Sequence, residues 1–141
     1  MNNQYAYGII LFFILCMCSC ASYGPKNKDL AGVLSNTQQT ITNLTEKIQT
    51  TGDKMLIETG QKLENKYLEL APVLENCNEK YALTTAYMTT LQESQRALQR
   101  VDKDFNSISD KAFILDAIYR DYNAKLTSIK SSPISDANSK I

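Results

Sequence analysis

The sequence contains no histidine and no tryptophan, and its 141 residues include only five glycines and three prolines. Histidine is the commonest general base near neutral pH and the commonest metal ligand, so its absence removes the simplest catalytic and metal-binding chemistry. Few glycines leave little material for a loop whose backbone could wrap a phosphate group. We therefore expect a chain that is not an enzyme and has no metal site, no cofactor and no small-molecule substrate.

Net charge is also lacking, because 15 Lys and Arg residues balance 15 Asp and Glu residues. Without a net field the chain has no general attraction for nucleic acid, so we expect no nucleic-acid partner. The charges are unevenly placed, since residues 1–25 contain none and Lys26 is the first. The chain therefore divides into an uncharged head and a body of roughly 120 residues, which is enough for one small domain.

The uncharged head contains a nearly unbroken apolar run at residues 8–19. As a helix this run would extend about 18 Å, whereas the hydrocarbon core of a bilayer is about 30 Å thick. An apolar run of this length followed by small residues is typical of a cleaved export signal. We therefore predict that the chain is exported.

Cysteines stand at three alternate positions around the end of this run, the last of them Cys20. This residue lies in the sequence Met17-Cys18-Ser19-Cys20-Ala21, which resembles the lipobox of bacterial lipoproteins. The resemblance covers about the first 21 residues. It implies cleavage after Ser19 and acylation of Cys20 as the first residue of the mature chain. The non-acidic Ala21 resembles the residue found in lipoproteins passed to the outer membrane, which places the expected anchor in the bacterial cell envelope.

A second interpretation of the head stays open, in which it is an uncleaved N-terminal anchor that runs to about Ala21. The leader, residues 1–7, has no Lys or Arg although export signals are normally basic there, and Met17 stands where the lipobox usually has leucine. The cysteines of the head would then be inert or palmitoylated. Lys26 and Lys28 would draw the body into the cytoplasm.

The rest of the chain divides into a tether, a helical domain and a tail. Residues 20–28 combine Gly24 and Pro25 with polar residues, which predicts a short flexible tether. Residues 131–141 are rich in serine and turn formers, which predicts a disordered tail. Between them, residues 29–130 repeat apolar side chains at alternating spacings of three and four, with no recurring strand pattern. The predicted fold class is therefore all-α.

Interruptions in this apolar stripe predict where the helices end. Gly52 followed by Asp53 offers a helix stop and a cap, so a corner is expected within residues 51–60. Pro72 has no backbone donor and disfavours helical geometry at the residue before it, so a kink or restart is expected there.

The remaining segment, residues 73–130, would form a helix about 87 Å long if it were unbroken. Its stripe would pack against residues 30–70 in an elongated hairpin, or against a second copy of the chain in a coiled coil. A break within residues 91–98 or 106–110 would instead give a small antiparallel helical bundle. The stripe keeps its phase through residues 106–110, which argues against the second break.

Cys77 is a candidate for an intermolecular disulfide. It lies on the apolar stripe between Leu74 and Tyr81, where a buried cysteine is common. An exported compartment is oxidising, so a disulfide to Cys77 of a second chain is the other open interpretation.

A second candidate is the cluster Tyr119, Tyr122 and Leu126 near the end of the stripe. Aromatic residues are common both in cores and in partner interfaces, and we name this cluster as the candidate recognition surface. The acidic residues around it, such as Asp116 and Asp121, alternate with basic ones. That pattern is typical of a solvated helix face rather than of a metal site.

The sequence therefore predicts a lipid-anchored cell-envelope protein that acts as a structural or protein-interaction module. Its expected partners are the membrane, through the anchor, and a protein or a second copy of the chain, through the apolar helical stripe. An accessory or exclusion factor of a secretion, conjugation or phage-entry machine is the alternative role. An uncleaved membrane anchor with a coiled-coil body is the alternative architecture.

Overall fold

The computed structural model describes residues 27–80 and 83–131, which form four α-helices. These are α2 (Leu30–Thr51), α3 (Lys54–Lys80), α4 (Thr85–Lys103) and α5 (Lys111–Lys130). No strand occurs within these two ranges. The all-α fold class predicted from the sequence is confirmed, in the form of a helical bundle.

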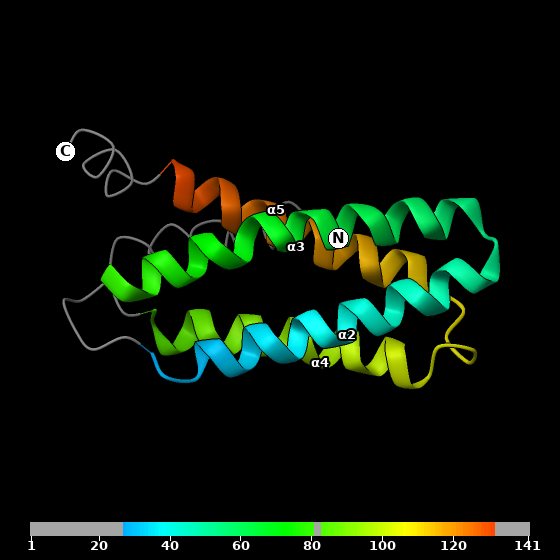
Figure 1. The fold of residues 1–141 in the computed structure, drawn as a ribbon, viewed down its shortest axis with the longest axis horizontal. Coiled ribbons are helices and arrows are strands. Elements are labelled where there is room, and N and C mark those ends of the chain that lie inside the picture. Colours follow the sequence, from blue (N-terminus) through cyan, green and yellow to red (C-terminus); the bar gives the residue numbers. More distant parts are fainter. Residues whose placement is uncertain (1–26, 81–82, 132–141) are drawn as a thin grey trace, which may run out of the picture.

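The helices run alternately in opposite directions along the long axis of the bundle (Figure 1). The most extensive packing is between α3 and α5, and α2 packs against both α4 and α3, whereas α4 and α5 contact each other less. Since α2 and α4 run in the same direction, as do α3 and α5, two of the neighbouring pairs are parallel. The consecutive helices α3 and α4 lie at diagonal positions of the bundle, so the chain crosses diagonally between them.

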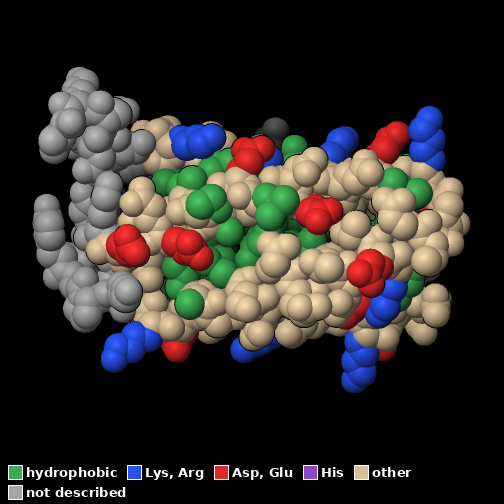
Figure 2. Space-filling model, in the orientation of Figure 1, with side chains coloured by type: hydrophobic (Ala, Val, Ile, Leu, Met, Phe, Trp, Pro, Cys, Tyr) green, Lys and Arg blue, Asp and Glu red, His purple; other side chains and the backbone are tan. Residues whose placement is uncertain are grey.

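The apolar stripes of the four helices meet in one core. Its fully buried members, with no exposed surface, are Leu70, Leu74, Leu98, Val101 and Leu115. Apolar side chains are visible along the line between α2 and α3, with several acidic groups beside them (Figure 2). The stripes are therefore used in packing the four helices against one another.

The corner between α2 and α3 lies where the sequence predicts it. Gly52 ends α2 with a left-handed φ of 68°, a backbone region that glycine adopts without the steric cost of a Cβ atom. The Asp53 side chain then accepts a hydrogen bond from the Leu56 amide (3.1 Å) and so caps the start of α3. The two residues together stop one helix and start the next.

The predicted restart at Pro72 is wrong, because α3 continues through this residue as one helix. A proline inside a helix costs about 3 kcal/mol relative to alanine, since it removes one backbone hydrogen bond. The carbonyl that loses its donor belongs to Leu68, whose side chain is 51% exposed, so water can reach that side of the helix. Burial of Leu70 and Leu74 on either side of the proline holds the helix together.

The expectation that no break occurs at residues 106–110 is also wrong, because α4 ends at Lys103 and a turn separates it from α5, which begins at Lys111. Two backbone amides of the turn donate to the Asp104 carbonyl (2.9 and 3.1 Å). Phe105 lies in the turn but is buried, so an apolar residue occupies the expected stripe position there and the sequence shows no change of phase. Asn and Ser side chains compete for backbone groups and favour such turns. The other predicted break, within residues 91–98, does not occur.

A boundary between α3 and α4 was not expected from the stripe, and the unbroken helix over residues 73–130 is therefore wrong. The Thr84 side chain accepts a hydrogen bond from the Tyr87 amide (3.2 Å) and caps the first turn of α4. Threonine is a favoured capping residue because its side-chain oxygen satisfies an otherwise unpaired amide. With this boundary the chain forms a compact bundle rather than a long coiled coil.

Candidate functional site

The residues singled out from the sequence fall in different parts of the molecule. Cys20 and Ser19, the predicted lipidation and cleavage positions, lie outside the described residues. Cys77 is half-buried near the C-terminal end of α3, so the structure favours neither packing nor an intermolecular disulfide. The disulfide stays a prediction.

The proposed recognition cluster is corrected by the structure, because two of its three members are in the core. Tyr122 and Leu126 are buried between the helices, at 2% and 3% exposure, and only Tyr119 is partly exposed. Residues three and four positions apart on a helix share one face, and here that face of α5 packs against the rest of the bundle. The cluster is therefore not a surface that a partner could contact.

Tyr122 belongs instead to a buried pair of tyrosines in the middle of the bundle. Its ring centroid lies 5.9 Å from that of Tyr67 on α3, with the two ring planes inclined by 49°. The Tyr67 hydroxyl donates a hydrogen bond to the Leu34 carbonyl on α2. Burial, with a smaller effect from the charge of Glu75, raises the pKa of Tyr67 to about 12. Burial also raises the pKa of Tyr122, with Tyr67 and Asp121 adding to the effect.

This pair should make the bundle lose stability at high pH. In the unfolded chain a tyrosine ionises near pH 10, whereas folded Tyr67 stays neutral until about pH 12. Its contribution to stability is thus complete below pH 10 and falls as the pH rises toward 12. Urea unfolding at pH 8, 10 and 11 should show this fall, and a Tyr67→Phe chain should show a shallower one. Equal pH dependence of the two proteins would contradict the expectation.

The described chain enters the bundle at Asn27, where a buried side chain of α3 holds it. Asn78 is 5% exposed, and its Oδ1 atom accepts a hydrogen bond from the Asn27 amide (2.9 Å). Its Nδ2 atom donates to the Asn27 carbonyl (3.0 Å), and the same Oδ1 accepts from the Leu83 amide (3.3 Å). One side chain therefore joins the start of the described chain, α3 and the segment before α4. It fixes the end of the bundle from which a tether would extend.

Replacing Asn78 with alanine should destabilise the bundle by about 2–3 kcal/mol, because backbone groups of two segments lose their buried partner. Urea unfolding would measure the change in free energy, and hydrogen exchange should be faster at the amides of Asn27 and Leu83. Asn65→Ala, at an exposed position of the same helix, is the matched control and should change stability by less than about 0.5 kcal/mol. Unaltered exchange at Asn27 would contradict the role given to Asn78.

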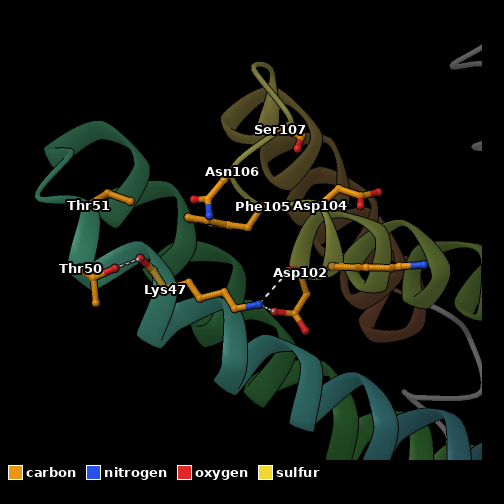
Figure 3. A pocket seen from close by; sticks show the side chains of 9 residues that line it. Lys47, Thr50, Thr51, Asp102, Asp104, Phe105, Asn106 and Ser107 are labelled. Carbon is orange, nitrogen blue, oxygen red and sulfur yellow. Dashed lines mark hydrogen bonds and ion pairs between the residues drawn. The ribbon is translucent and has the colours of Figure 1, made fainter.

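The opposite end of the bundle has an open cleft of about 560 Å³ between the end of α2 and the α4–α5 turn (Figure 3). Lys47 reaches across it from α2, with its Nζ atom 2.7 Å from an Asp102 side-chain oxygen and 2.8 Å from the Asp102 carbonyl. The Thr50 and Thr51 hydroxyls donate to carbonyls of their own helix (2.6 and 2.7 Å). The lysine is 45% exposed, so the ion pair contributes at most about 1 kcal/mol.

This cleft is a structural feature of the bundle end rather than a centre for acid–base chemistry. Lys47 forms an ion pair with Asp102, and its positive charge is also favourable there because it lies at the C-terminal end of the α4 helix dipole. Within the described residues, no group of three or more Cys, His, Asp or Glu side chains could hold a metal ion.

An ion pair between a buried lysine and a partly exposed aspartate lies where α4 and α5 face each other. Lys125 is 1% exposed, and its Nζ atom lies 2.5 Å from Asp121 Oδ2 on the same helix. The Ser94 hydroxyl of α4 donates to the same carboxylate oxygen (3.3 Å), and the lysine Nζ lies 5.7 Å from the Tyr87 ring centroid. The ammonium group of Lys125 is therefore enclosed by protein.

Sequence reasoning missed both Asn78 and Lys125, which lie beside the apolar stripe rather than on it. Asn78 follows Leu74 at the helical spacing of four, and Lys125 follows Tyr122 at the spacing of three. A polar residue three or four positions from a stripe residue shares its helix face, and that is the signal that could have identified them, because such a group must find partners when buried.

No described helix combines the length and apolar character needed to cross a bilayer. No protein-family model matches the chain, and no curated protein or solved structure matches it either.

Proposed function

We propose that this chain is an exported lipoprotein of the bacterial cell envelope, in which acyl groups on Cys20 hold the helical bundle at a membrane. The observation that carries the proposal is Ser19-Cys20-Ala21 at the end of an apolar run of export-signal length. Two acyl chains give stable anchoring, whereas a single chain binds a membrane only reversibly. The role of the bundle is then to present a folded surface to a protein partner, and it requires no catalytic residue.

The geometry of the bundle supports this role. The described chain begins at Asn27, which Asn78 holds at one end, while the cleft at Lys47 and the α4–α5 turn lie at the other end. The longest helix, α3, extends about 40 Å at 1.5 Å per residue. Anchoring through Cys20 would therefore keep one end of the bundle close to the membrane and hold the other end well above it.

The test compares the membrane-extracted wild-type chain with a Cys20→Ser chain. We expect the wild-type mass to fit a chain that begins at Cys20 and carries acyl groups, and we expect Cys20→Ser to abolish both cleavage and acylation. Cys18→Ser is the matched control, since it removes a cysteine two positions away and should leave the mature protein unchanged. A wild-type chain that still begins at Met1 would overturn the proposal in favour of an uncleaved anchor.

A further inference from the structure

The outward side of α3 carries a ridge on which every charge is negative. Glu64, Leu68, Pro72, Glu75 and Glu79 follow one another at spacings of three and four, so they share one face of the helix. Glu64 is half-buried and the other four are exposed. We call this set the acidic ridge. Leu68, near its centre, is a large apolar residue that is 51% exposed.

The acidic ridge runs beside α2, which supplies no compensating charge along it. The Thr45 hydroxyl oxygen of α2 lies 3.4 Å from Glu64 Oε2. Residues 30–45 of α2 contain no charged side chain, and Lys28 and Asp29 just before them have opposite charges. In Figure 2 the acidic groups accordingly lie beside apolar side chains along the line between α2 and α3.

The nearest lysine of α3 belongs to another face of the helix. Lys66 is two positions from both Glu64 and Leu68, and residues at that spacing do not face the same way. Its Nζ atom lies 3.5 Å from Glu69 Oε2, so this lysine already has a carboxylate partner. The negative charge of the acidic ridge is therefore left for a group from outside the bundle.

Pro72 adds a backbone acceptor to the acidic ridge. Proline has no N–H group, so the Leu68 carbonyl lacks the donor that a helix normally supplies four residues later. Both residues are exposed, and a partner can reach this oxygen. Carboxylates also only accept hydrogen bonds. The acidic ridge thus offers acceptors and apolar surface, and its five side chains offer no donor.

We propose that the acidic ridge is the docking site for a basic amphipathic helix of another protein, an inference that rests on the partner-binding role in the proposed function. Lys or Arg side chains of that helix pair with Glu64, Glu75 and Glu79, and one of its donors satisfies the Leu68 carbonyl. Its apolar side chains pack on Leu68 and Pro72. Glu64 and Glu75 are about 16 Å apart along α3, so the basic residues of the partner lie at a matching separation.

The charge and the exposed leucine together select this partner over other occupants. Nucleic acid and anionic lipid headgroups are negative, so the glutamates repel them. A second copy that packed through the same ridge would place like charges together. Within the described residues, no group of three or more Cys, His, Asp or Glu side chains could hold a metal ion. A small organic cation would leave Leu68 uncovered, whereas an amphipathic helix covers it.

The test uses the full-length chain in a nonionic detergent, with a photo-reactive amino acid in place of Leu68. The probe is a synthetic helical peptide with a leucine stripe flanked by lysines, and the matched peptide has glutamate at every lysine position. The lysine peptide should cross-link at least about ten-fold more than the glutamate peptide, because ion pairs replace repulsions. Equal yields for the two peptides would overturn the proposal.

Phe113 provides a matched position for the photo-reactive amino acid, because it is also a large apolar residue and is 75% exposed on α5. Apolar exposure alone would make the two positions equally reactive. The lysine peptide should instead cross-link at position 113 at least about five-fold less than at position 68, since ion pairs hold it at the ridge. A yield at position 113 as high as at position 68 would contradict a specific docking site.

Charge reversal makes the test specific for the acidic ridge. Glu75→Lys with Glu79→Lys should lower the yield of the lysine peptide at position 68 at least about ten-fold and raise that of the glutamate peptide. Glu93→Lys with Asp104→Lys is the matched control, because it makes the same change of charge at exposed positions on α4 and just after it. The control should stay within about two-fold of the wild-type yield. An equal loss in both double variants would show attraction to overall charge and sink the proposal.

The same labelled chain in its own membranes separates this proposal from the lipid anchor. At position 68 it should capture a segment of a different protein in which Lys and Arg outnumber Asp and Glu. Capture of an acidic segment, of lipid or of a second copy, or no capture, would overturn the docking site. The mass of the chain reports acylation of Cys20 independently. An acylated chain without a basic partner leaves the anchor standing alone, and an unacylated chain with one leaves the docking site standing alone.

Discussion

Replacing Leu70 with alanine should lower the free energy of unfolding by about 3–4 kcal/mol, because it removes a side chain that is completely buried and leaves a cavity. The side chain lies in α3, which packs against both α2 and α5, so the cavity would open where three helices meet. A rigid helical core closes over such a cavity only in part. This loss is a large fraction of the 5–15 kcal/mol by which small proteins are usually stable.

Leu68 provides a matched control for this prediction, since it lies two positions away on the same helix and is 51% exposed. Leu68→Ala removes the same atoms but opens no cavity, so stability should change by less than about 0.5 kcal/mol. Urea unfolding followed by circular dichroism would measure both values. Similar losses for the two substitutions would mean that α3 does not present Leu70 to the core as described.

Replacing Asp121 with alanine should destabilise the bundle by about 3–5 kcal/mol, because it leaves the Lys125 ammonium group buried without its carboxylate. Stability does not require a charged side chain at position 125. An apolar side chain of similar length can fill the same space without the cost of removing a charge from water, so Lys125→Met should be neutral or stabilising.

The double substitution Asp121→Ala with Lys125→Met should therefore recover most of the stability that Asp121→Ala loses. Comparing the four proteins by urea unfolding isolates the interaction between the two residues. If the double variant is no more stable than Asp121→Ala, the loss comes from the helix or from Ser94 rather than from an unpaired lysine. That result would contradict the account of the ion pair.

The parts of the fold that sequence reasoning predicted are those set by local rules. A glycine followed by aspartate stops one helix and caps the next, and Gly52 and Asp53 do so without help from the rest of the chain. The core was also predictable, because buried residues such as Leu44, Leu74 and Leu98 lie on the apolar stripe at helical spacing.

The parts that could not be predicted depend on tertiary packing. Pro72 is a helix breaker by its own chemistry, yet α3 continues through it, with Leu70 and Leu74 buried on either side. Phe105 continues the stripe from a turn, so periodicity alone could not separate α4 from α5. Which helices become neighbours was also beyond local patterns, since the parallel pairs follow from the diagonal crossing between α3 and α4.

The same distinction applies to the candidate functional residues. Tyrosine and leucine are common both in interfaces and in cores, so only the fold shows that Tyr122 and Leu126 are buried. The lipidation at Cys20 is a matter of sequence alone and stays a prediction.

The diagonal crossing also has a consequence for how the chain reaches its native state. The first hairpin, α2 with α3, leaves the face of α3 that packs against α5 exposed until the end of the chain is available. The second hairpin has few internal contacts and depends on the first for its apolar partners. Much of the packing thus joins segments distant in sequence, which slows folding relative to a bundle of sequential neighbours.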